Sequence, residues 1–117
     1  MPVYTKLEGT WELNYISGPR IAFDGLYKTK KPFIRFDVSK MMVNGNTSCN
    51  NFNGKLDVDG NKINFNGPMA MTQMACPGMG ESVFLDNLKK VSSWSVSGDS
   101  TLNFIMGDIA IMRFSKK

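Results

Sequence analysis

The sequence contains no histidine, and this absence excludes several kinds of active site. Imidazole is the usual general base beside a nucleophile and the commonest zinc ligand, so most nucleophilic triads and histidine-based zinc sites are unavailable. The two cysteines, Cys49 and Cys76, are too few for a cysteine-rich zinc site, and a catalytic thiolate would lack its usual partner. We therefore expect no enzymatic activity, no metal and no cofactor.

Long hydrophobic runs are missing as well. No segment approaches the roughly 20 apolar residues that a membrane-spanning helix needs. The first residues, Met1 to Tyr4, have neither the basic region nor the apolar region of an export signal. We expect that the chain as given carries no such signal, although a mature exported domain or a trimmed lipoprotein would begin in the same way.

The charge is modest and scattered. Fourteen basic and ten acidic side chains give a net charge of +4 among 117 residues. The lysines lie in small groups without interleaved aromatic residues, so we expect a solvated basic surface and no nucleic-acid partner. This length suits one domain, residues 1–117, that buries roughly two thirds of the surface of its unfolded chain.

Alternating apolar and polar residues predict short antiparallel strands joined by tight turns. In the first strand, Trp11, Leu13 and Tyr15 are expected to share one buried face, and a brief strand is expected at Ile21 to Phe23. The clearest hairpin turns at Asp59-Gly60. About eight strands are expected in all, the others within residues 33–38, 41–43, 55–58, 62–65, 94–97, 101–105 and 109–114.

One convincing helix is expected at about 81–91, where Phe84, Leu85, Leu88 and Val91 form an apolar stripe. The stripe must pack on a sheet. The predicted fold is therefore mainly β with one helix (α+β): an antiparallel, curled sheet or partly open barrel with the helix packed on it.

Two segments hold both cysteines. Asparagine and glycine make Gly45 to Gly54 a corner braced by its own side chains, whereas the Met/Ala segment from Met69 to Pro77 is expected to run through the interior. In an oxidising compartment Cys49 and Cys76 could form a disulfide, which would contribute about 3–4 kcal/mol; in a reducing one they would be buried thiols. Both alternatives stay open.

The methionines around Cys76 also have two interpretations. Thioethers and a thiolate together favour Cu(I), but methionine is more commonly a pliable filler of an irregular core, and we expect the second role. The residues concerned are Met69, Met71, Met74 and Met79.

These two segments and the helix resemble the META domain family, which includes the HslJ-like heat-shock proteins. The resemblance extends from about Trp11 to Phe114. It departs from the family pattern at Ser48, where glycine is common, and at Lys55-Leu56, where an aromatic is usual. The motif residues are Cys49, Asn50, Asn51, Phe52, Gly54, Thr72, Met74, Cys76 and Glu81, with Val96 and Leu102 in the closing hairpin.

The resemblance implies a β-rich domain with one packed helix, often the exported or lipid-anchored part of a bacterial envelope protein. We accordingly expect a monomeric, stress- or envelope-associated structural or protein-binding module on the periplasmic side, with an unidentified protein partner. Membrane contact is expected only through a lipid anchor preceding this sequence. The alternative is a small apolar ligand carrier, with a cavity lined by Trp11, Phe36 or Trp94.

Overall fold

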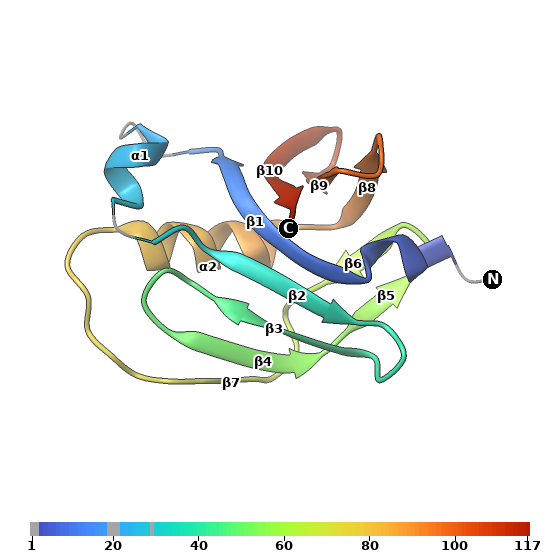
Figure 1. Ribbon diagram of the computed structural model, residues 1–117, viewed down its shortest axis with the longest axis horizontal. Coiled ribbons are helices and arrows are strands. Elements are labelled where there is room, and N and C mark those ends of the chain that lie inside the picture. Colours follow the sequence, from blue (N-terminus) through green and yellow to red (C-terminus); the bar gives the residue numbers. More distant parts are fainter. Residues whose placement is uncertain (1–2, 19–21, 29) are drawn as a thin grey trace.

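The computed structural model describes residues 3–18, 22–28 and 30–117 (Figure 1). The described part contains a 3-10 helix at Val3–Leu7, the helices α1 (Phe23–Leu26) and α2 (Gly80–Lys90), and ten strands. The strands are β1 (Gly9–Ile16), β2 (Phe33–Asp37), β3 (Met42–Asn46), β4 (Asn51–Lys55), β5 (Asp57–Asp59), β6 (Lys62–Asn64), β7 (Met69–Met71), β8 (Ser93–Ser97), β9 (Thr101–Met106) and β10 (Ile109–Lys116).

All ten strands belong to one antiparallel sheet in the order β5-β6-β8-β9-β10-β1-β2-β3-β4-β7, which curls into a half-barrel. The predicted mainly β fold with a curled antiparallel sheet is therefore confirmed. The α+β label is not, because α2 is the only helix of substantial length among the described residues. Neither α-helix described here has the length and apolar character needed to cross a bilayer.

The interior of the curl is filled by aromatic side chains from distant strands. Phe104 on β9 contacts Phe36 on β2, Phe65 just after β6, and Phe114 on β10, with ring centroids 6.5, 5.3 and 5.0 Å apart. Phe104 and Phe114 are fully buried, and Phe36 and Phe65 nearly so. The centre of the sheet is thus a packed core.

A bulge in β1 overturns one prediction. The pairing with β10 shifts register between Leu13, which lies opposite Phe114, and Tyr15, which lies opposite Arg113. Because the extra residue reverses the alternation of faces, Tyr15 is 40% exposed and Ile16 takes the inward place. The Tyr15 ring instead lies beneath the guanidinium of Arg113, 5.0 Å from its centroid.

The segment after β1 also differs from the prediction. Ile21 lies outside the described residues, but Phe23 begins the short helix α1 and is not in a strand. Its ring packs on Tyr27, with centroids 5.1 Å apart. Apolar residues at Phe23, Leu26 and Tyr27 have helical spacing, which a three-residue pattern cannot reveal.

The hairpins expected at β2/β3, β5/β6 and β8/β9 are confirmed, as are β10 and a helix in the place of α2. The Met/Ala segment, however, does not run through the interior. It forms the terminal strand β7 and then continues as an exposed strip over residues 72–79, which runs along the outer margin of the sheet to α2 (Figure 1).

The packing of Phe104 gives a stability prediction. Truncating this fully buried ring in Phe104→Ala should cost about 3–5 kcal/mol of unfolding free energy, because it leaves a cavity at the centre of the core. Tyr15→Ala is the control, and the bulge predicts a loss within about 1 kcal/mol. Urea unfolding measures both; similar losses for the two variants would contradict the bulge.

Candidate functional site

A buried threonine helps to brace the turn between β3 and β4. The Thr47 hydroxyl accepts hydrogen bonds from the backbone N–H of Cys49 at 3.3 Å and of Asn50 at 2.9 Å. Ser48 adopts a left-handed backbone with φ of 83°, which explains why glycine is common at this position in the family the sequence resembles. Sequence reasoning overlooked Thr47, which is fully buried.

Asn50 connects this turn to two other segments. Its Oδ1 accepts hydrogen bonds from the Thr72 hydroxyl at 2.8 Å and the Met74 backbone N–H at 2.7 Å. Its Nδ2 donates to Glu81 Oε2 at 2.7 Å and to the Met74 carbonyl at 3.1 Å. The side chain is 2% exposed. These residues with Thr47 form the Asn50 network, which joins the turn, the strip and α2.

Glu81 has a defined structural role at the start of α2. Its Oε2 accepts hydrogen bonds from Thr47 Oγ1 at 2.6 Å and from Asn50 Nδ2. A carboxylate in the first turn also interacts favourably with the helix dipole. Charge-assisted hydrogen bonds of this kind are roughly twice as strong as neutral ones, so Glu81 anchors the helix to the turn.

Cys49 and Cys76 form a disulfide in this structure, with Cα atoms 6.0 Å apart. Cys49 is buried in the turn and Cys76 is exposed on the strip. Because both sulfurs are bonded to each other, neither supplies a thiolate for catalysis or for Cu(I). The expected role of methionine as core filler is wrong for Met74 and Met79, which are 60% and 53% exposed.

The other motif residues position the strand β4. Phe52 is buried against Phe84 of α2, with ring centroids 6.1 Å apart. Asn51 exchanges two bonds with Thr72: its N–H donates to the Thr72 hydroxyl, and its carbonyl accepts from the Thr72 N–H, both at 3.0 Å. A side chain at Gly54 would meet Met69 and the Pro68 carbonyl at about 3 Å, so glycine allows β7 to approach. Together the motif residues form a junction of three segments: the turn, the strip and α2.

A groove lies beside this junction, where the paired strands separate. Pairing of β4 with β7 ends at Gly54 and Met69, whereas pairing of β5 with β6 ends at Asp57 and Asn64. Between these pairs the chain opens into a groove of about 760 Å³. Sequence reasoning did not find it, because it depends on how β4 continues into β5.

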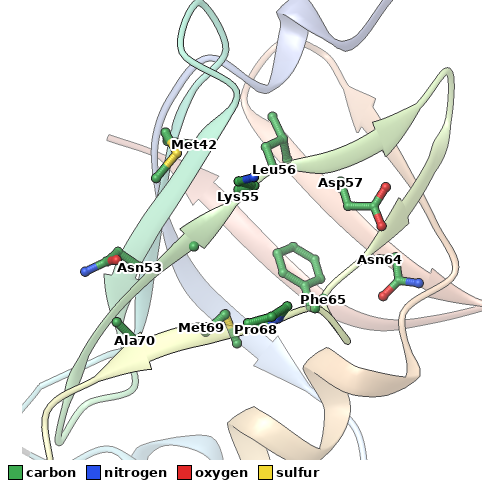
Figure 2. Close-up of a pocket in the computed structure, with 12 residues that line it drawn as sticks. Met42, Asn53, Lys55, Leu56, Asp57, Asn64, Phe65, Pro68, Met69 and Ala70 are labelled. Carbon is green, nitrogen blue, oxygen red and sulfur yellow. The ribbon is translucent and has the colours of Figure 1, made fainter.

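The groove has an apolar floor and a polar rim. Leu56 and Phe65, each 5% exposed, extend the core to its floor. Figure 2 shows Lys55 and Leu56 on one side and Phe65, Pro68 and Met69 on the other. Polar side chains complete the rim, namely Asn53, Lys55, Asp57 and Asn64.

The cavity expected around Trp11, Phe36 or Trp94 is not what the structure contains. Trp11 and Phe36 are buried in the packed core, and Trp94 donates its Nε1–H to the Gly60 carbonyl at 3.0 Å. The groove is instead lined by residues 53–57, 64, 65 and 67–70 with Met42. Within the described ranges, no three histidine, cysteine, aspartate or glutamate residues gather as a metal site would require.

Tyr27 holds the other side of the helix start. Its buried hydroxyl donates to the Gly80 carbonyl at 2.9 Å, and a side chain at Gly80 would collide with the Tyr27 ring. Burial raises the pKa of this hydroxyl to about 12. The helix start is thus held from one side by Tyr27 and from the other by the Asn50 network.

The disulfide should stabilise the fold. Reduction, or the double substitution Cys49→Ser/Cys76→Ser, should lower the unfolding free energy by about 3–4 kcal/mol, because the bridge closes a long loop of the unfolded chain. Urea unfolding with and without reductant measures the loss, with the double variant as the control that must not respond to reductant. A wild-type protein that is equally insensitive would contradict the prediction.

The raised pKa of Tyr27 predicts a pH dependence. An unfolded tyrosine titrates near 10, so the folded protein retains this proton more tightly and loses that stability as the pH rises through about 10 to 12. The stability advantage of the wild type over Tyr27→Phe should therefore shrink across this range. Urea unfolding at several pH values measures it, and an advantage that stays constant or grows would be inconsistent with this assignment.

Solved structures and one family model are similar to this chain. No curated protein sequence matches the chain. Two structures solved by NMR share its fold: one has a TM-score of 0.68 and 21% identity, covering 99% of this chain and 95% of the other. The second, from Burkholderia xenovorans, has a TM-score of 0.72 and 17% identity, covering 98% and 86%. The META domain family model matches residues 5–117, so the chain belongs to the META domain family.

Proposed function

We propose that this domain is a non-enzymatic protein-binding module that captures apolar side chains of a partner in the groove between β4–β5 and β6–β7. The observation that supports it is the groove itself, whose floor is apolar and whose rim is polar. Protein interfaces commonly combine a desolvated apolar centre with a solvated polar rim.

The contacts of the motif residues support a binding role over a catalytic one. Glu81 Oε2 receives two hydrogen bonds, and both oxygen and nitrogen of the Asn50 amide are engaged. A general acid or base must reach a substrate, whereas these groups face one another within the junction. Their arrangement is suited to holding the turn, the strip and α2 together.

A location in the bacterial cell envelope, on the periplasmic side, is part of the proposal. The Cys49–Cys76 disulfide is consistent with it, because disulfides persist in oxidising compartments. The association with stress and a lipid anchor preceding the sequence remain proposals of the same kind.

Groove variants test the protein-binding role. Met42→Glu and Ala70→Glu each place a charge at an exposed position that lines the groove. Both should reduce capture of a cross-linked partner from envelope extract by about tenfold or more, as is typical of interface hot spots. Ile109→Glu is the matched control, because Ile109 is 62% exposed and does not line the groove. If Met42→Glu and Ala70→Glu captured as much partner as the control Ile109→Glu, the proposal would be refuted.

A small apolar ligand carrier is the second candidate, because about 760 Å³ is within the size range of ligand pockets. The fluorescent probe N-phenylnaphthylamine distinguishes it. Stoichiometric binding that is lost in Met42→Glu but kept in Ile109→Glu would favour the carrier, whereas failure of the probe to bind would eliminate it.

A further inference from the structure

The two ends of the sheet differ in how they are protected. At one end, β5 carries Asp57 and Asp59, and charged residues of this kind discourage edge-to-edge pairing. At the other end, β7 has the sequence Met-Ala-Met. From Ile63 to Gly80 the chain contains no charged residue. The edge of β7 therefore lacks the protection that the edge of β5 has.

The hydrogen bonds of β7 define its outer edge. The Thr72 N–H donates to the Asn51 carbonyl, and Ala70 lies opposite Asn53. Since the direction of the main-chain groups alternates along an antiparallel strand, the N–H and C=O of Met71 point away from β4. An extended segment alongside β7 can bond to these groups.

Positively charged residues near the far end of the strip would favour a partner with negative charge. Beyond β7, the strip passes a second hollow of about 470 Å³, lined by Cys76, Pro77 and Met79 on one side. Lys28 and Lys30, both exposed, line it on the other side and are its charged residues among those the structure describes. A partner that continues past β7 would meet positive charge there.

We propose that the free edge of β7 accepts an extended segment of a partner protein as an added antiparallel strand, and that acidic residues at the amino-terminal side of this segment contact Lys28 and Lys30. Main-chain hydrogen bonds to Met71 supply affinity, as in other cases of strand addition. An antiparallel partner runs opposite to the strip, which places its amino-terminal side at the lysines. The inference rests on the proposed protein-binding role and specifies the type of partner.

Selection from a displayed library of random twelve-residue peptides tests it. Enriched peptides should contain an uncharged, alternating β-forming segment preceded by aspartate or glutamate. Their binding, measured by fluorescence anisotropy, should weaken by about tenfold or more in Met71→Pro, which removes the outward N–H, and should persist in Met71→Ala, which also loses the Met71 side chain but keeps the N–H. Circular dichroism verifies that both variants are folded.

A charge reversal keeps the test decisive if Met71→Pro does not fold. The double variant Lys28→Glu/Lys30→Glu should weaken the binding of the acidic peptides and strengthen the binding of versions with lysine in place of the acidic residues. The control Lys89→Glu/Lys90→Glu, which changes exposed residues of α2, should alter neither. The inference would be overturned if no peptide were enriched, or if neither Met71→Pro nor Lys28→Glu/Lys30→Glu changed peptide binding. If the domain self-associates and Met71→Pro abolishes this association, the edge of β7 pairs with a second copy of the chain and the inference is overturned.

Failure of this inference can be distinguished from failure of the proposed function. Peptides that lose binding in Met42→Glu, a groove variant on β3, but bind Met71→Pro normally would leave the groove proposal standing and refute strand addition. Peptides that bind Met42→Glu normally and lose binding in Met71→Pro support strand addition.

Discussion

The hydrogen bonds of one buried amide, that of Asn50, hold together the turn between β3 and β4, the strip and the start of α2. The amide bonds to Thr72 and Met74 on the strip and to Glu81 on the helix, and its own segment is the turn between β3 and β4. A buried polar group costs free energy unless it is paired, and here each polar atom of the side chain is paired. The requirement to pair this amide therefore fixes where the strip lies.

The positions of the groove and of the free edge follow from this constraint. The strip is held to β4 by Thr72 and to the turn by the disulfide, so β7 becomes the last strand of the sheet. The strand β4 also continues into β5. The β4/β7 pair and the β5/β6 pair therefore separate near Leu56, and the groove lies between them. The junction thus sets the place of β7, which is the last strand of the sheet and also contributes Met69 and Ala70 to the groove.

Local pattern predicted much of the sheet, because alternation and turn residues are local signals. The β5/β6 hairpin at Asp59-Gly60 and the helix with Phe84 and Leu88 needed only neighbouring residues. The bulge at Tyr15 was not predictable, since it depends on pairing with β10, which is about a hundred residues away in the chain. The exposed strip was misread for a related reason: its Met/Ala composition suits a core, but its place is set by bonds to Asn50.

A double-mutant cycle between Asn50→Ala and Glu81→Gln tests the central claim that this junction is a coupled scaffold. Each variant should be destabilised in urea unfolding, and the pair should show a coupling energy of about 1 kcal/mol or more, because contacting residues in one network are not additive. Asp86→Asn, an exposed carboxylate on the same helix, combined with Asn50→Ala serves as the control and should be additive. Losses for Asn50 and Glu81 that add within about 0.3–0.5 kcal/mol would contradict the account.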